Sequence, residues 1–119
     1  MPPEAAKRLL DAWLACGAIA EFTARMDFAQ FAASALVRSA VERQFEIIGE
    51  SLGRAGQVAP VLLERIPEIP RIVGLRNRLI HGYDSVDEQI VWDIVQTKLP
   101  TLRADLAVAL ANAGFPPEK

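Results

Sequence analysis

The sequence predicts an all-α fold, a bundle of four main helices and one short helix in a single domain over residues 1–119. Three observations lead to this prediction. Apolar residues recur at spacings of three and four along most of the chain, and no segment sustains the alternation typical of a strand. With 119 residues, of which 51% are hydrophobic, the chain is long enough for one modest core. It contains no internal repeat and no linker long enough to separate two domains.

The residue counts exclude several kinds of site. Cys16 is the single cysteine, so the chain can form neither an intrachain disulfide framework nor a cysteine-clustered zinc site. His81 is the single histidine, so one chain cannot supply a two-histidine metal site or a two-histidine acid–base pair. Two copies of the chain would lift that last limit.

Charge and hydropathy narrow the class of protein further. The net charge of −2 argues against a general basic coat for nucleic acid, so any contact with nucleic acid is expected to be local. No apolar run approaches the roughly 18 residues of a membrane span, and the N-terminus opens without a basic region typical of a secretory signal. We therefore expect a soluble, cytoplasmic protein without contact to a membrane.

The first helix is expected from Glu4 to about Met26. Pro2 and Pro3 precede it, and proline followed by an acidic residue is typical of a helix start. Its polar residues form a narrow stripe, and the remaining circumference is apolar. Such a helix needs neighbours on more than one side, and a second subunit is one way to supply them.

The second helix is expected to begin after Asp27, which is a suitable N-cap. Its core stripe is formed by residues at helical spacing, namely Val37, Val41, Phe45, Ile48 and Leu52. Gly49 lies within this stripe, where glycine costs about 1 kcal/mol relative to alanine. Two interpretations remain open for Gly49: this end of the helix frays, or another helix approaches it closely.

Residues 53–56 are expected to end the second helix, and a short helical turn follows around residues 58–65. Pro70 then starts another helix, which is expected to end between Gly82 and Asp84. Ser85 and Glu88 stand three apart in a capping-box pattern and open the last long helix.

The last helix carries apolar residues in register from Val91 to Leu110. Pro100 falls inside it and is expected to bend or split it, because proline lacks the backbone N–H and its ring clashes with the preceding turn. Gly114 with the prolines beyond it is typical of a helix end.

The polar cluster at residues 76–84 contains the candidate functional residues. At 100° per residue, Asn77 and His81 share one face of the helix, while Arg76 and Tyr83 share another. One ideal helix does not direct all four groups to one point. Either Gly82 distorts the helix end, or the site is a groove lined by two copies of the helix.

These residue types suit work on a phosphodiester. Arginine pairs with phosphate oxygens and keeps its charge, and histidine takes or gives a proton near neutral pH. Upstream arginines extend the cluster into a basic strip formed by Arg65, Arg71, Arg76 and Arg78 against Glu68. The alternative interpretation is a helix end whose arginines and histidine are only solvated, since cations there interact favourably with the helix dipole.

The run from Arg76 to Tyr83 resembles the signature of HEPN domains, with arginine and a polar residue followed by histidine. The tyrosine two residues after His81 resembles the HepT toxin branch, whose motif is Arg-x4-His-x-Tyr. The likeness covers nearly the whole chain, from about Leu9 to Leu110, and includes residues 40–50, 67–70 and 86–95.

The resemblance implies a metal-independent endoribonuclease toxin without a cofactor, acting as a homodimer with motifs from both subunits in one cleft. It implies that Arg76 and His81 are catalytic and that Asn77 supports them. Arg71 and Arg78 of the basic strip are expected to bind RNA. The implied partner is an MntA-like minimal nucleotidyltransferase antitoxin, which attaches AMP to Tyr83. The dimer would bring two histidines into one cleft.

Two other functions remain open. A non-catalytic helical module that binds a nucleotide or a nucleotidyltransferase partner would use the same arginine and histidine. The second alternative is a dimeric scaffold whose motif has decayed. The presence of Arg76, His81 and Tyr83 argues against it.

Outside the motif, the expectations concern pairing and packing. Glu46 and Glu50 are expected to meet the motif arginines, whereas Glu42 is expected in a solvated stripe that pairs with Arg43 and Arg54. Buried or interface positions are expected for Cys16, Trp13 and Trp92.

Overall fold

The computed structural model describes residues 1–81 and 87–117, with side chains described as far as Arg78 and again from Asp87. Within these residues the fold is all-α, as the periodicity predicts, and contains no strand. The elements in chain order are α1 (Pro3–Thr23), α2 (Phe28–Ala33), α3 (Ala35–Val58), α4 (Leu62–Arg65), α5 (Ile69–His81), α6 (Glu88–Asp93), η1 (Ile94–Lys98) and α7 (Leu99–Asn112).

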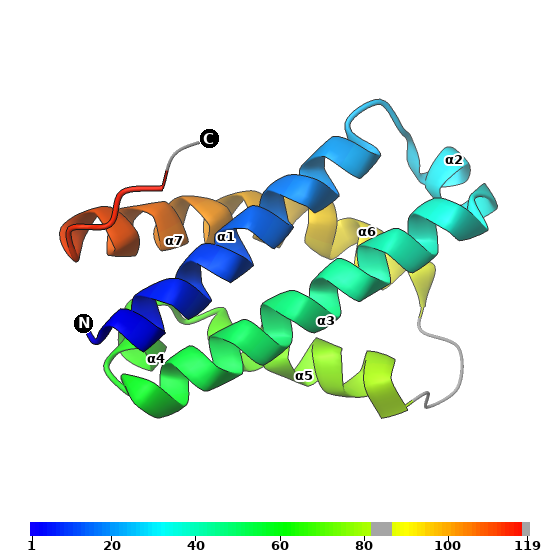
Figure 1. Cartoon of the computed structure of the whole chain (residues 1–119). Coiled ribbons are helices and arrows are strands. Elements are labelled where there is room, and N and C mark those ends of the chain that lie inside the picture. The colour runs from blue at the N-terminus through cyan, green and yellow to red at the C-terminus, as the bar shows by residue number, and fades with distance from the viewer. Residues whose placement is uncertain (82–86, 118–119) are drawn as a thin grey trace.

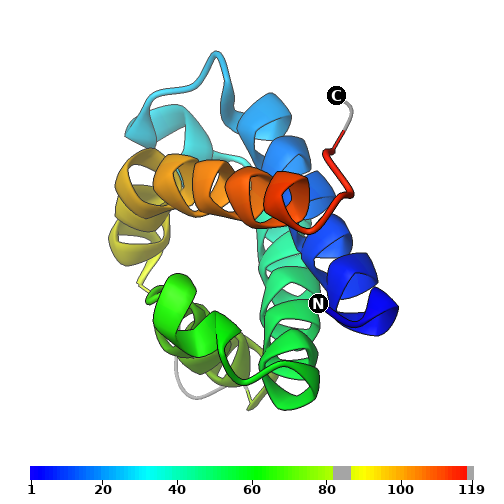
Figure 2. The same cartoon turned by 90° about the vertical axis from the view of Figure 1, so that its left-hand side faces the viewer.

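The long helices α1 and α3 form the most extensive pairing and run side by side through the molecule (Figure 1). α7 packs on α1, and α5 packs on α3. In both cartoon views α7 lies above α5 (Figures 1 and 2). Figure 2 shows that α5, which carries the motif, and α7 lie on the same side of the α1–α3 pair, α7 against α1 and α5 against α3.

One core is shared by the four main helices. Its largest fully buried side chains come from each of them and include Leu9, Ile19, Phe45, Ile48, Leu52, Ile72, Leu102 and Leu106. α1 meets the requirement for neighbours on more than one side within a single chain, because it packs on both α3 and α7. Leu14 and Phe22 of α1 remain 53% and 40% exposed.

The second expected helix is divided in two, which the sequence analysis missed. Asp27 caps α2 as predicted: its carboxylate accepts from the Gln30 N–H at 2.8 Å, and the Gln30 side chain accepts from the Asp27 N–H at 2.9 Å. Ser34 then adopts an extended conformation, and its hydroxyl accepts from the Val37 N–H at the start of α3. The helix breaks at Ser34 because its hydroxyl binds a backbone N–H that would otherwise belong to a continuous helix.

α3 also extends further than expected. It continues through Gly53 and Gly56 to Val58, so the prediction that residues 53–56 end this helix is wrong. Packing against the core outweighs the low helix propensity of the two glycines. The short helix α4 accordingly covers only Leu62–Arg65 rather than starting near Val58.

The last helix is split at the predicted place. The backbone of η1 widens to π-helical geometry just before Pro100, and α7 continues from there. Pro100 cannot donate a backbone hydrogen bond to the preceding turn, which accounts for the local widening. Asp87 caps α6 through its carboxylate, whereas Ser85 lies outside the described residues. Gly114, with φ of 87°, follows the end of α7 as expected.

Candidate functional site

Arg76 lies where α5 crosses α3, with its stem against Gly49. A Cβ built on Gly49 would overlap the Cβ of Arg76 and lie 2.7 Å from its Cγ. Gly49 is buried in the middle of α3, so of the two interpretations that the sequence left open, the close approach is correct. The absence of a side chain at Gly49 is what brings the stem of Arg76 onto the backbone of α3.

The guanidinium of Arg76 is only partly satisfied within the described residues. Its Nη1 donates a hydrogen bond to Oδ1 of Asn77 at 3.1 Å. Its Nε is buried and has no hydrogen-bond partner among the described side chains and backbone. A buried charged donor without an acceptor is costly, and an incoming oxygen would satisfy it. Asn77 thus contacts Arg76, although the two belong to different helix faces in the ideal geometry.

Two motif residues fall outside the part of the site that the structure describes. His81 is the last residue of α5, and its side chain lies outside the described residues. Tyr83 also lies outside the described residues. The site that combines Arg76, Asn77, His81 and Tyr83 therefore stays a prediction, in both its forms: one distorted helix end, or a groove lined by two copies of the helix.

The arginines of the basic strip differ in whether a carboxylate already lies beside them. Nη1 of Arg71 lies 3.7 Å from Oε2 of Glu68, so this arginine has a partial counter-charge. Arg65 and Arg78 are exposed, and neither has an ion pair within the described part of the chain. Arg78 and Asn77 are the exposed polar groups next to Arg76.

The glutamates of α3 do not meet the motif arginines as expected. Glu46 pairs with Arg43 at 3.3 Å, and Arg54 pairs with Glu4 of α1 at 3.0 Å. Glu50 is exposed and has no ion pair among the described residues. Of the carboxylates of Glu46 and Glu50, only that of Glu46 has a partner on its own helix in the described part of the chain, and that partner is Arg43.

Glu42 is not simply solvated either. Burial raises the pKa of the Glu42 carboxyl, and the neighbouring Glu46 and Glu88 raise it further, while the guanidinium of Arg38 opposes them. Arg38 itself pairs with Glu88 at 3.2 Å and so connects α3 to α6. These charges stabilise the contact between α3 and α6.

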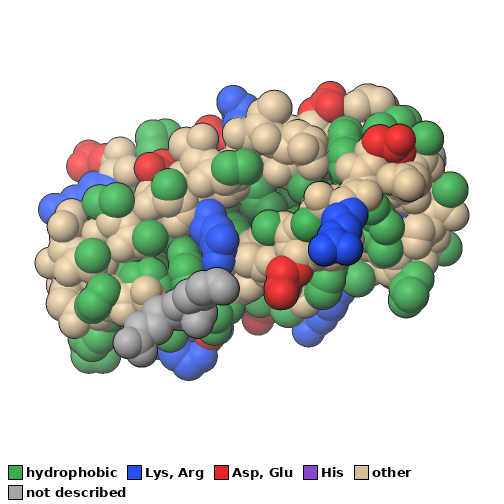
Figure 3. Space-filling model, turned by 90° about the horizontal axis from the view of Figure 1, so that it is seen from above, with side chains coloured by type: hydrophobic (Ala, Val, Ile, Leu, Met, Phe, Trp, Pro, Cys, Tyr) green, Lys and Arg blue, Asp and Glu red, His purple; other side chains and the backbone are tan. Residues whose placement is uncertain are grey.

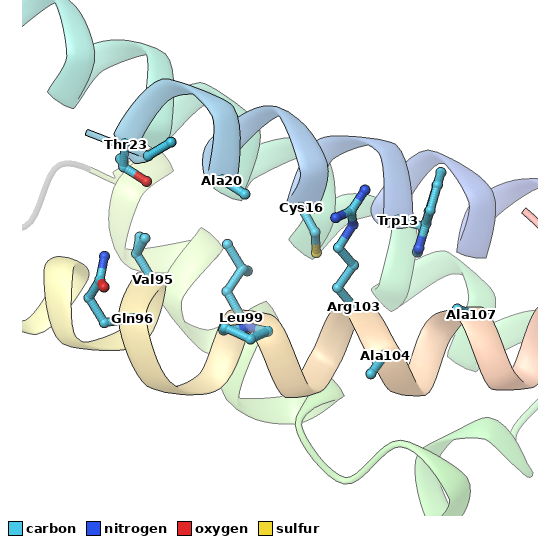
Figure 4. A pocket seen from close by; sticks show the side chains of 12 residues that line it. Trp13, Cys16, Ala20, Thr23, Val95, Gln96, Leu99, Arg103, Ala104 and Ala107 are labelled. Carbon is cyan, nitrogen blue, oxygen red and sulfur yellow. The ribbon is translucent and has the colours of Figure 1, made fainter. Parts of the chain in front are cut away.

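A hollow lies between α1 and the run from η1 to α7. It has a volume of about 690 Å³, and no residue of α3 or α5 lines it. Figure 4 shows Arg103 extending from α7 up to α1, where its guanidinium lies between Cys16 and Trp13. The sequence analysis did not single out Arg103. Gly17, one turn from Trp13, is the only local hint, because a small residue permits a close approach there.

Two expectations about apolar residues are confirmed. Cys16 is 1% exposed, and burial raises the pKa of its thiol to about 12. Trp13 is 8% exposed, and Trp92 packs against Phe28 and Phe31 with ring centroids 6.5 and 5.2 Å apart. Cys16 and Trp13 belong to the buried core, and the partly buried Trp92 packs against it.

The face of the molecule seen from above carries charges of both signs (Figure 3). In the view from above, basic and acidic side chains are interspersed (Figure 3). Within residues 1–81 and 87–117, no three histidine, cysteine, aspartate or glutamate side chains gather as a metal site would require. Among the described helices, none is long and apolar enough to cross a lipid bilayer.

Comparison with models of protein families shows to which family the chain belongs. The model of the family described as "Ribonuclease HepT-like" matches residues 14–109, which include the C-terminal half of α1, the elements from α2 to η1 and most of α7. The chain belongs to the HepT-like ribonuclease family. It is therefore a ribonuclease with an all-α, HEPN-type fold.

Curated relatives agree with membership of the HepT-like family. A Methanocaldococcus jannaschii protein, provisionally named an RNase, is 34% identical over 92 residues, which are 76% of this chain and 82% of the relative. A Thermococcus cleftensis protein, provisionally named ribonuclease HepT, is 36% identical over 88 residues, 71% of this chain and 76% of that protein. No solved structure matches the sequence significantly.

Proposed function

We propose that this HepT-like ribonuclease is the toxin of a HepT/MntA-type toxin–antitoxin pair. In this proposal it is a metal-independent endoribonuclease that acts in the cytoplasm through the motif Arg-x4-His-x-Tyr. The single observation that supports it best is Arg76: its stem is held at Gly49, its Nη1 is held by Asn77, and its Nε has no acceptor among the described residues. An arginine prepared in this way suits a phosphate oxygen.

The proposed reaction is internal attack on the phosphodiester. The imidazole of His81 takes the proton of a ribose 2′-hydroxyl, whose oxygen then forms a bond to the adjacent phosphorus. The bond from phosphorus to the 5′-oxygen breaks, and this oxygen receives a proton from the protonated imidazole of the second subunit, which becomes neutral. The products are a 2′,3′-cyclic phosphate and a 5′-hydroxyl. Arg76 stabilises the negative charge that develops on the phosphoryl oxygens.

The proposal includes a homodimer with the motifs of both subunits in one cleft, because each chain supplies one histidine. Arg78 and Arg71 contact the RNA backbone beside Arg76. The partner is a minimal nucleotidyltransferase antitoxin that transfers AMP to Tyr83. A mass measurement by light scattering at micromolar concentration is expected to give two chains, and the mass of a single chain would contradict this part.

The decisive experiment compares RNA cleavage by the purified protein with that of two variants. His81→Ala and Arg76→Ala are expected to lose about 100-fold or more of the cleavage rate, because each removes an acid–base or electrostatic group. Arg25→Ala is the matched control, since Arg25 is exposed and lies outside both the motif and the basic strip. Circular dichroism checks that all variants keep their helices.

Chelation separates this mechanism from a metal-dependent one. The wild-type rate is expected to persist in EDTA, because the proposed steps use side chains alone. A loss of cleavage in EDTA, or near-normal rates in either motif variant, would contradict the mechanism. Binding of RNA without any cleavage would instead favour the non-catalytic module.

A further inference from the structure

Gly49 occupies a position where helix propensity disfavours glycine. It lies inside α3, where glycine costs about 1 kcal/mol relative to alanine. Its backbone conformation does not require glycine, because Gly114 is the described glycine with positive φ. The requirement is one of space, since Gly49 is buried against Arg76.

The space at Gly49 cannot be recovered by a side-chain rotation. A Cβ at this position would overlap the Cβ of Arg76, lie 2.7 Å from its Cγ and lie 3.4 Å from the backbone oxygen of Ile72. Each Cβ is fixed by its own backbone, so neither of the two clashing Cβ atoms could turn away. A larger residue at position 49 would have to separate α3 from α5.

The close approach is local to Arg76. One turn further along α3, a Cβ on Gly53 would lie 3.6 Å from Cγ2 of Val73, which is ordinary contact. On α5 itself, a Cβ on Gly74 would have no atom within 4 Å among the atoms compared. These two glycines provide matched controls for the same substitution.

We propose that Gly49 is a positioning residue of the nuclease, which sets the place of Arg76 by letting α5 lie directly on α3. The inference rests on the proposed function, in which Arg76 acts on the phosphate. The stem of Arg76 is held at Gly49 and its guanidinium at Asn77, so little conformational freedom is left to lose on binding RNA. α5 packs mainly on α3, so separation of the two helices moves the whole motif helix.

The kinetic test compares three alanine variants under single-turnover conditions. Gly49→Ala is expected to lower the cleavage rate constant by about 10- to 100-fold, since a displacement near 1 Å costs that much in positioned catalysis. Its affinity for an RNA with a 2′-deoxy nucleotide at the cleavage site is expected to stay within about twofold of wild type, because the exposed arginines remain. Gly53→Ala and Gly74→Ala are expected to cleave like wild type. A wild-type rate constant for Gly49→Ala would overturn the proposal.

A stability cycle tests the contact without relying on activity. Gly49→Ala is expected to lower the Tm by about 5–15 °C, as overpacking does in small domains. In an Arg76→Gly background the clashing Cβ is absent, so the same substitution is expected to change the Tm little or to raise it. Equal losses in both backgrounds would overturn the proposal, even for a nuclease that works as proposed. If the effects of Gly49→Ala and Arg76→Gly on the Tm are strongly coupled but the protein cleaves no RNA, the proposed function is refuted while the contact between Gly49 and Arg76 is supported.

Discussion

The guanidinium of Arg103 lies over the indole ring of Trp13, with its central carbon 4.7 Å from the ring centroid. Its Nη2 lies above Gly17, 2.9 Å from the position that a Cβ would take there. Nε of Arg103 is buried without a hydrogen-bond partner among the described residues. A stacked cation therefore joins α7 to α1, and its stabilising energy comes from the ring and from packing rather than from a carboxylate.

Arg103→Ala is expected to destabilise the bundle. A desolvated cation–π contact contributes about 1–2 kcal/mol, and the arginine stem covers apolar surface as well. The expected fall in Tm is about 4–10 °C, measured by thermal unfolding followed by circular dichroism. Arg103→Met keeps most of the stem and is expected to lose less, while the exposed Arg25→Ala serves as a control. A rise in Tm for Arg103→Ala would mean that the unsatisfied Nε costs more than the stacking contributes.

Arg78→Ala is expected to weaken RNA binding more than Arg71→Ala does. Arg78 is exposed with no ion pair among the described residues, whereas Arg71 lies 3.7 Å from the carboxylate of Glu68. Loss of one phosphate contact lowers the slope of log affinity against log salt by about 0.7 for single strands. Fluorescence anisotropy with an uncleavable RNA at several salt concentrations measures both quantities. A larger loss for Arg71→Ala would contradict the ranking.

Tyr83→Phe is expected to give an active nuclease that the antitoxin cannot silence. The substitution removes the oxygen that accepts AMP in the proposed function and keeps the ring. An attached AMP would add negative charge beside Arg76 and repel the RNA backbone, as phosphorylation does at other sites. Mass spectrometry after incubation with ATP and the nucleotidyltransferase is expected to find the added mass on the wild-type Tyr83 peptide. A label on another residue, or neutralisation of Tyr83→Phe, would contradict this assignment.

Cys16 is expected to make the stability of the fold fall at high pH. Burial raises the pKa of its thiol from 9.0 to about 12, so the folded state holds the proton more tightly than the unfolded state. The thiol has no effect below about pH 9, and its destabilising effect grows as the pH rises from 9 towards 12. Denaturant unfolding across this range, compared between wild type and Cys16→Ala, isolates the effect. The free energy of unfolding is expected to fall less steeply with pH in Cys16→Ala than in wild type. Identical slopes in the two proteins would contradict this prediction.

Several features of this fold could be predicted because their causes are local in the chain. Asp27 caps a helix because its side chain meets donors three residues away, and Pro100 interrupts a helix because it lacks a donor of its own. The apolar stripe of α3 predicts its buried face for the same reason. The end of α3 could not be predicted, because packing on α1 and α5 carries the helix through Gly53 and Gly56.

The candidate site shows the same division. Arg76 and Asn77 were found from residue type and spacing, but their mutual hydrogen bond depends on side-chain conformations that spacing does not specify. The expected contacts of Glu46 with motif arginines failed, because Arg43 is close to it on the same helix. The spacing of residues along one helix predicts which side chains share a face. It does not predict which neighbouring helix packs against that face.

The sequence by itself determined the all-α class, most of the helix starts and the residues of the motif, because periodicity, caps and motif spacing act over a few residues. The tertiary structure alone decided that Gly49 lies against Arg76 and that Arg103 stacks on Trp13. Each of these contacts joins residues on different helices, and it forms only when the core has set how closely those helices approach.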